Sequence, residues 1–152
     1  MNPAFIKPAT NTSSEAIETI REELDLFDDW VQRYRYLIDL GKKLPDFPLE
    51  WQQDQYRVLG CQSQVWLNYH FQEGCLFFAG NSDAAIVRGL IFLILRIYSG
   101  RSIKEILNID PRFVKDLGLS GALSANRSNG IASMIQYMQT IATKYKFNTN
   151  KL

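Results

Sequence analysis

The side chains best able to do chemistry in this sequence are two cysteines and one histidine. Cys61 follows Gly60 in the stretch RVLGCQSQVWL, where three uncharged polar side chains, Gln62, Ser63 and Gln64, separate the thiol from an apolar run. Because a thiolate is both a nucleophile and a metal ligand, a cysteine in a connecting loop indicates thiol exchange or metal binding. An inert, half-buried thiol is the alternative that the residues alone leave open.

Metal binding finds little support in these residues. A structural zinc site or an iron–sulfur cluster normally takes four protein ligands, whereas Cys61, His70 and Cys75 offer at most three. His70 falls among the polar positions of an alternating segment and is predicted to face solvent, while Cys75 is predicted to be a small apolar residue of a strand. We therefore expect no metal site, and the single histidine also argues against a Cys/His or Ser/His catalytic pair.

Two further polar residues stand next to predicted helix starts. Asp83 precedes a long apolar segment, and Arg127 precedes the last helix. An aspartate in such a position most often caps the helix, with Ser82 as the other candidate cap, and an arginine most often lies in solvent. Neither residue indicates catalysis by itself.

Composition and charge restrict the function classes. The chain has 152 residues, of which 46% are hydrophobic, and a formal net charge of +1. We predict one globular domain with no partner among nucleic acids or membranes, because the balanced charge gives no long-range attraction to phosphate. The longest apolar run, 89–95, is far short of the ~20 residues that cross a bilayer, and the N-terminus lacks a signal pattern. We expect a cytoplasmic protein with reduced cysteines.

Helical periodicity marks the N-terminal part of the chain. Residues 1–12 include two prolines and show no periodicity, so they are predicted to form a flexible tail. Thr12 and Glu15 have the spacing of a capping box before a first amphipathic helix. The acidic pair at 28–29 is predicted to start a second helix, which Gly41 ends.

The period then changes to two. Residues 65–72 alternate between apolar and polar side chains, as a strand with one buried face requires. Glu73 and Gly74 form a turn, and residues 75–79 return as the second strand of a hairpin. Residues 57–59 are short enough for a third, edge strand, so the sequence predicts a small three-stranded antiparallel sheet.

The remainder of the chain is helical again. A long apolar helix ends near Gly100, a capping box starts at Ser102, a short helix ends near Gly118, and the last helix carries one apolar stripe of Ile131, Met134, Ile135, Met138 and Ile141. Residues 13–146 are predicted to form the domain and residues 147–152 to fray. This order of elements predicts a two-layer α+β fold, in which N- and C-terminal helices cover the sheet.

Four blocks of this sequence match the conserved blocks of one known family in their order along the chain. They are YLIDLGKKLP (36–45), GCQSQVWL, which begins at Gly60, NSDAAIVRGL (81–90) and NRSNGIASM (126–134). With GCQSQVWL as the cysteine signature, these blocks resemble those of the SufE/CsdE family of sulfur acceptors. The resemblance implies a SufE/NifU-like fold. It also implies a persulfide relay in which Cys61 takes sulfane sulfur from a cysteine desulfurase.

The same resemblance implies roles for other groups. The pyridoxal phosphate cofactor belongs to the desulfurase and this chain needs none, so the protein is expected to be a carrier and desulfurase activator and not an enzyme. A downstream iron–sulfur scaffold would receive the sulfur. Residues 62–64 would let the loop rearrange on docking, and Val65, Trp66 and the strand that follows would wall an apolar pocket for the persulfide. Asp83 would fix the base of the loop by capping, and Arg127 would contact the partner or the loop.

Two other classes of function stay open at this point. Scaffold proteins that bind metal or assemble clusters share a related α+β core but use more cysteines than this chain has. A non-catalytic adaptor of the desulfurase would not depend on Cys61 at all. The sequence does not distinguish a monomer from a homodimer, and it does not identify the desulfurase that is served.

Overall fold

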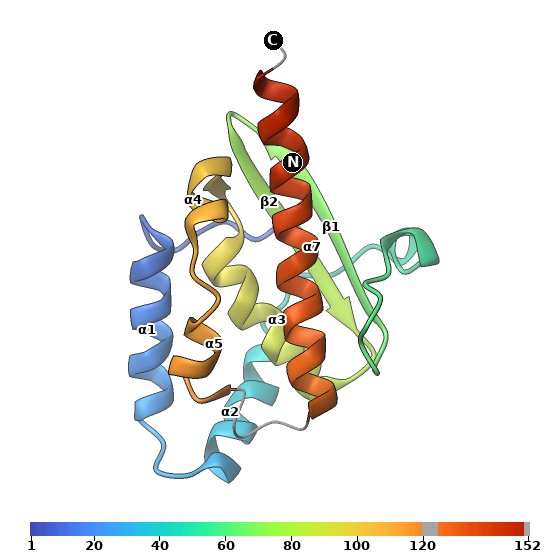
Figure 1. Cartoon of the computed structure of the whole chain (residues 1–152). Helices are drawn as coiled ribbons and strands as arrows, with labels where there is room; N and C mark the ends of the chain where they lie inside the picture. Colours follow the sequence, from blue (N-terminus) through green and yellow to red (C-terminus); the bar gives the residue numbers. More distant parts are fainter. Residues whose placement is uncertain (120–124, 151–152) are drawn as a thin grey trace.

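The structure is a computed structural model that describes residues 1–119 and 125–150, with side chains described for 1–119 and 130–147. Figure 1 shows the arrangement of its elements. They are α1 (Ser13–Asp25), α2 (Trp30–Gly41), the short 3-10 helices η1 (Leu49–Trp51) and η2 (Asp54–Tyr56), β1 (Val65–Gln72), β2 (Cys75–Ser82), α3 (Ala85–Tyr98), β3 (Arg101–Ser102), α4 (Ile103–Asn108), α5 (Phe113–Asp116) and α7 (Ala125–Asn150). The predicted α+β class, with helices before and after a hairpin, is confirmed.

A three-stranded antiparallel sheet forms the centre of the fold, in the order β1-β2-β3. Glu73 and Gly74 join β1 to β2 with φ values of 52° and 79°, which fits the predicted hairpin turn. The predicted third strand at 57–59 is wrong. That segment makes only an isolated bridge between Arg57 and Trp66, and the third strand is β3, which pairs with the start of β2.

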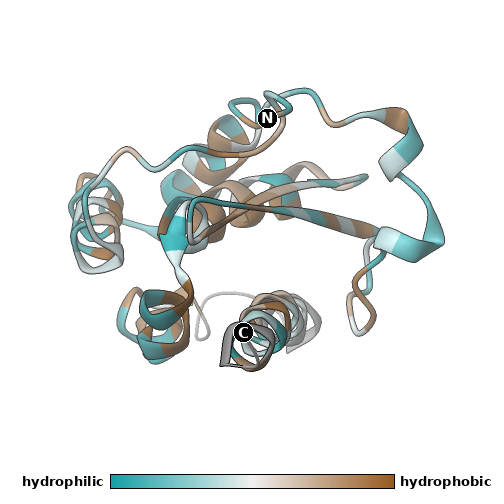
Figure 2. Ribbon diagram, turned by 90° about the horizontal axis from the view of Figure 1, so that it is seen from above, coloured by the Kyte–Doolittle hydropathy of each residue, from teal (hydrophilic) through white to brown (hydrophobic). Residues whose placement is uncertain are grey.

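Apolar side chains cover both faces of this sheet. One face, which includes Val65 and Leu67, packs into the main core with the helices, and α3 crosses between α2 and α7. The other face carries a smaller cluster made of Ala4, Phe5, Phe47, Trp66 and Ala79. Seen from above, α7 and the N-terminal segment lie on opposite sides of the sheet (Figure 2).

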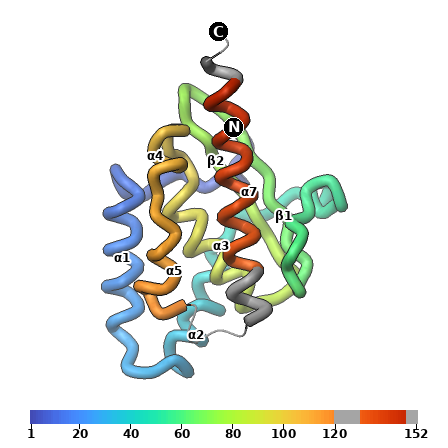
Figure 3. Tube along the Cα trace, in the orientation of Figure 1, coloured from blue at the N-terminus to red at the C-terminus, as the bar shows by residue number. Residues whose placement is uncertain are grey.

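The N-terminal segment is therefore not the flexible tail that the sequence predicts. Ala4, Phe5 and Ile6 are buried, and the N–H of Ile6 donates to the carbonyl of Phe78 at 2.9 Å. The segment runs behind the hairpin before it enters α1 (Figure 3). Its apolar residues bury the outer face of the sheet, which the alternation in β1 had assigned to solvent, and this burial offsets the loss of chain entropy.

Two glycines allow α2 and α3 to cross at very short range. A Cβ on Gly89 would lie 1.9 Å from the carbonyl oxygen of Leu37, and a Cβ on Gly41 would lie 2.8 Å from the backbone nitrogen of Gly89. Gly41 is the last residue of α2, as predicted, but the residue after it is right-handed helical and no left-handed cap forms. Gly41 is thus required for the helix crossing and not for a helix stop.

Predicted caps position the helices at the edge of the core. The hydroxyl of Thr12 accepts from the N–H of Glu15 at 3.1 Å, and that of Ser102 accepts from the N–H of Glu105 at 3.1 Å. The carboxylate of Glu105 accepts a 2.7 Å hydrogen bond from the N–H of Ser13. The Ser102 hydroxyl therefore caps α4, while the Glu105 carboxylate ties α4 to the start of α1.

The last helix closes the main core. Its five predicted stripe residues are all buried: Ile131, Met134, Ile135, Met138 and Ile141. α7 continues to Asn150, and residues 151–152 lie outside the described residues. That residues 147–152 fray stays a prediction. No helix in the described ranges is long and apolar enough to cross a membrane.

Candidate functional site

Cys61 lies in the loop 59–64, between the isolated bridge and β1. At the base of the loop, the N–H of Val58 donates to the carbonyl of Val65 at 2.9 Å. Gly60 has a φ of 90°, which glycine adopts at low cost because it has no Cβ. The chain therefore reverses direction immediately before the thiol.

The loop rests on the beginning of α7, at a surface formed by Gly130 and Ser133 that we call the thiol seat. The thiol of Cys61 donates to the carbonyl of Gly130 with an S···O distance of 3.7 Å. A Cβ on Gly130 would lie 3.5 Å from Cys61 Sγ, and a Cβ on Gly60 would lie 2.5 Å from the Ser133 hydroxyl. Both glycines thus bring the loop and the helix close together around the sulfur.

The thiol seat disfavours the reactive form of Cys61. Partial burial raises the pKa of the Cys61 thiol, and the positive charge of Arg57 opposes that increase. An ordinary thiol with a pKa of ~8.5 is only about 3% thiolate at pH 7, and the thiolate is the attacking species. In the free protein Cys61 is therefore held mainly as a protonated, weakly nucleophilic thiol.

Asp83 holds the other end of the loop. Its Oδ1 accepts a 3.1 Å hydrogen bond from the N–H of Gln64, and its own N–H donates to the Gln64 carbonyl at 3.4 Å. The N-cap residue of α3 is Ala84, and no side-chain hydrogen bond caps the start of this helix. The expected cap by Ser82 or Asp83 is therefore wrong, because the Asp83 carboxylate is directed to the loop and Ser82 accepts from the Ala84 N–H.

The other predicted loop residues present no charge next to the thiol. Gln62 and Gln64 are exposed and Ser63 is half-buried. Their role in loop rearrangement stays a prediction. Arg127 belongs to α7, but its side chain lies outside the described residues.

The apolar wall expected from Val65 and Trp66 does not form as one surface. Val65 is buried in the main core, against which Cys61 also packs. Trp66 is buried in the second cluster, on the opposite face of the sheet. Neighbouring residues of a strand point to opposite faces, so only Val65 lies on the side of the thiol.

Cys75 and His70 lie away from this site. Cys75 is paired with Gln72 at the hairpin end of β1, and the 8-residue length of that strand separates the two cysteines by on the order of 20 Å. His70 is half-buried and not simply solvent-facing, since its ring lies 5.7 Å from the ring of Phe5. Among the described residues, no group of three His, Cys, Asp or Glu side chains is placed to hold a metal ion.

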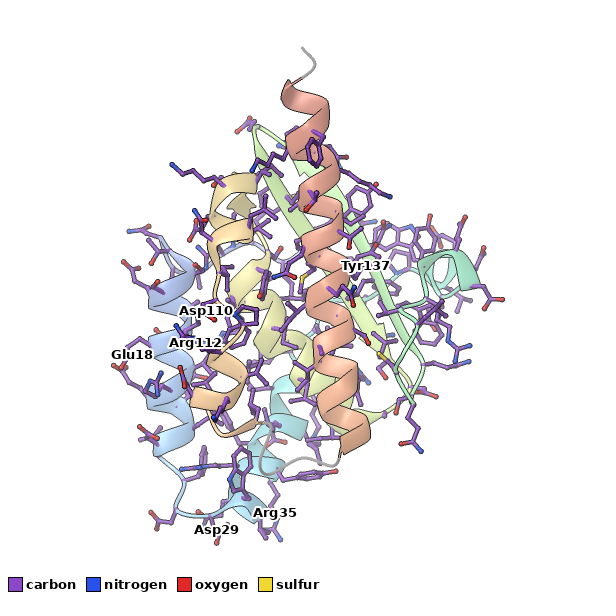
Figure 4. All side chains as sticks on the ribbon, in the orientation of Figure 1. Glu18, Asp29, Arg35, Asp110, Arg112 and Tyr137 are labelled. Carbon is purple, nitrogen blue, oxygen red and sulfur yellow. The ribbon has the colours of Figure 1, made fainter. Side chains whose placement is uncertain are left out.

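Sequence reasoning missed several residues that surround the thiol. Arg57 is near Cys61 in the chain and could have been proposed as its cation. Gly130 and Ser133 come from a distant helix, so no local pattern assigns them to the cysteine. Farther along α7, the hydroxyl of Tyr137, labelled in Figure 4, donates to the carbonyl of Leu67 at 3.4 Å and joins α7 to β1.

Known proteins resemble this chain in sequence and, in one solved structure, in fold. An uncharacterised SufE-like protein of Rhizobium meliloti (strain 1021) is 40% identical over 132 residues, which cover 84% of this chain and 94% of the relative. An uncharacterised SufE-like protein of Rhizobium etli is 40% identical over 126 residues, or 80% of this chain and 85% of the relative. Among solved structures, a hypothetical protein from Thermus thermophilus shares the fold with a TM-score of 0.70 and 18% identity, over 91% of this chain and 97% of that one.

A family profile extends the agreement across most of the chain. The profile of the SufE domain, described as an Fe-S metabolism associated domain, matches residues 18–142. This range contains Cys61, Asp83 and the thiol seat. The chain therefore belongs to the SufE family, whose domain is associated with iron–sulfur metabolism.

Proposed function

We propose that this protein accepts sulfane sulfur from a cysteine desulfurase on Cys61, thereby stimulates the desulfurase, and carries the sulfur toward iron–sulfur cluster assembly. The observation that carries the proposal is the position of Cys61, on a loop held to the body by a few reversible contacts. They include the thiol hydrogen bond to the Gly130 carbonyl and the two hydrogen bonds between Gln64 and Asp83. They are weak enough to be exchanged for contacts with a partner.

The transfer is a thiol–disulfide exchange that needs no outside oxidant, because the donor cysteine is reduced to a thiol as Cys61 is oxidised to the persulfide. The Cys61 thiol loses its proton, and the thiolate attacks the outer sulfur of the donor's cysteine persulfide. A new S–S bond forms on Cys61 as the donor's S–S bond breaks. The donor cysteine leaves as a thiolate, which takes up the released proton, and Cys61 becomes the persulfide.

Burial of Cys61 gives this transfer a built-in order. The raised pKa of the thiol keeps the free protein weakly reactive toward other electrophiles. Movement of the loop away from Gly130 removes the desolvation, and a partner that excludes water and supplies positive charge favours the thiolate further. Fast transfer is therefore coupled to docking.

This proposal gives the protein no catalytic cofactor of its own. Pyridoxal phosphate would belong to the desulfurase, and the sulfur acceptor would be an iron–sulfur scaffold in the same cytoplasmic compartment. This chain would act as a substrate and carrier and not as an enzyme. The attacking thiol would depend on the partner for activation, because burial raises its pKa in the free protein.

The desulfurase turnover rate tests the proposal. A cysteine desulfurase is supplied with cysteine, and alanine release is measured with the wild-type protein, Cys61→Ser and the matched variant Cys75→Ser. The proposal predicts stimulation by the wild type and by Cys75→Ser, and none by Cys61→Ser. Stimulation that survives in Cys61→Ser would favour an adaptor instead, and a cluster spectrum on anaerobic titration with iron and sulfide would favour a scaffold.

A further inference from the structure

A leucine next to the thiol is the most exposed large apolar side chain among the described residues. Leu59 is 83% exposed, although it stands two positions before Cys61 and directly after the buried Val58. Single exposed leucines are common on protein surfaces and carry no meaning alone. Leu59 differs from the other exposed apolar side chains because it lies in the loop that carries Cys61 and that a sulfur donor must contact.

The turn at Gly60 places Leu59 and Cys61 in opposite environments. Gly60 lies against Ser133, and the thiol that follows is packed against Gly130. Leu59, on the other side of the same turn, projects into solvent. A protein that approaches the loop therefore meets the leucine while the thiol is still in its seat.

We propose that Leu59 is the apolar anchor that the sulfur-donor protein binds before Cys61 leaves the thiol seat. This inference rests on the proposed function, and the surface that receives Leu59 is an apolar pocket beside the persulfide site of the desulfurase. Residues 62–64 are uncharged and polar, so Leu59 is the large apolar contact that the loop offers. Burial of a leucine in such a pocket supplies affinity that can be used to displace the loop.

Gly60 links the anchor to the thiol. Between Val58, which is fixed by its hydrogen bond to Val65, and the contact of Cys61 with Gly130, the chain contains only Leu59 and Gly60. A shift of Leu59 into a partner's pocket is therefore transmitted over two residues to Cys61. Glycine tolerates the change in backbone angles that this movement requires.

The test is a concentration series of this protein with a fixed amount of desulfurase and excess cysteine. Leu59→Ala is compared with Leu49→Ala, because Leu49 is 78% exposed but lies on η1, outside the loop. We expect kcat/KM for this protein to fall about tenfold in Leu59→Ala, because both docking and release of the thiol lose the leucine, and to stay at the wild-type value in Leu49→Ala. Reaction of Cys61 with a small aromatic disulfide, which needs no docking, should be equal in all three proteins.

Three results would overturn the inference. An unchanged kcat/KM in Leu59→Ala would show that the donor does not bind this side chain. An equal fall in Leu49→Ala would show a general loss of surface hydrophobicity, and an altered rate with the small disulfide would show that Leu59 acts by positioning the loop. A wild-type protein that gains no sulfur contradicts the proposed function itself, whereas a wild type that gains sulfur with unchanged kcat/KM in Leu59→Ala contradicts the anchor alone.

Discussion

Loss of the Asp83 carboxylate should release the Cys61 loop. The change Asp83→Ala removes the acceptor for the Gln64 N–H, whose hydrogen bond to Oδ1 is 3.1 Å long. Asp83→Asn is the matched control, because its side-chain oxygen can still accept from the same N–H. The two variants therefore separate the hydrogen bond from the rest of the side chain.

The expected size of the effect follows from this one bond. A hydrogen bond to a charged group contributes about 1.5–3 kcal/mol, and the exposure of Asp83 reduces this to about 1 kcal/mol. About 1 kcal/mol shifts the balance between the seated and the released loop about fivefold. Since only the released thiol reacts readily, the reactivity of Cys61 should increase by the same factor.

The assay is the rate of reaction of the free protein with a small aromatic disulfide that releases a coloured thiolate. It is done in a Cys75→Ser background, so that only Cys61 reacts. Asp83→Ala should react about fivefold faster than the parent, and Asp83→Asn close to the parent rate. A rate for Asp83→Ala that is equal to or lower than that of the parent would refute the idea that Asp83 restrains the loop.

Three further predictions concern the pH dependence of Cys61 and the stability of the fold. Because burial raises the pKa of the Cys61 thiol, the midpoint of a rate-against-pH profile for Cys61 should lie at a higher pH than that of a cysteine peptide. The stability that the seated thiol contributes is present below the ordinary thiol pKa, and it is lost as the pH rises through the raised pKa of the folded protein. Gly89→Ala should lower the free energy of unfolding by at least about 3 kcal/mol in urea titrations, since its Cβ would lie 1.9 Å from the Leu37 oxygen; a loss below about 1 kcal/mol would contradict the close helix crossing. Arg96 pairs with Glu23 at 2.6 Å and holds the pKa of Glu23 below its usual value. The Glu23→Gln variant should therefore be less stable than the wild type at neutral pH, and the difference in stability should shrink as the pH falls below about 4. A difference that persists in acid would exclude the ion pair as its cause.

The fold was predictable from sequence where a local pattern determines an element. Caps and turns satisfy backbone groups within a few residues, so a short stretch of sequence is enough to predict them. The caps at Thr12 and Ser102 and the turn at Glu73 and Gly74 are examples. The apolar stripe of α7 is predictable for the same reason, since a helix repeats its buried face at a fixed period.

The errors in the fold come from contacts between distant segments. Residues such as Asn68 and His70 predict that the outer face of β1 is exposed to solvent. In the structure Phe5 covers this face, and Phe5 belongs to the N-terminal segment, which α1 and α2 separate from β1 in the chain. The third strand, Arg101–Ser102, is too short to show any alternation. Its pairing with β2 is fixed by the position of α3 and not by its own sequence.

The site was predictable in part. The loop position of Cys61 follows from Gly60 and from the change of periodicity after it. The contact of Asp83 with that loop was expected at the correct place but through a helix cap, whereas the structure shows direct hydrogen bonds to Gln64. The thiol seat could not be predicted, because a glycine at 130 acquires its meaning only when α7 packs against the loop.

The most direct test of the central claim is to locate the sulfur itself. The protein is incubated with a cysteine desulfurase and cysteine, its intact mass is measured, and the modified residue is mapped in the wild type, Cys75→Ser and Cys61→Ser. The proposed function predicts one added sulfur atom on Cys61 in the first two proteins and none in Cys61→Ser. Sulfur that accumulates on Cys75, or on the Cys61→Ser variant at the wild-type rate, would contradict it.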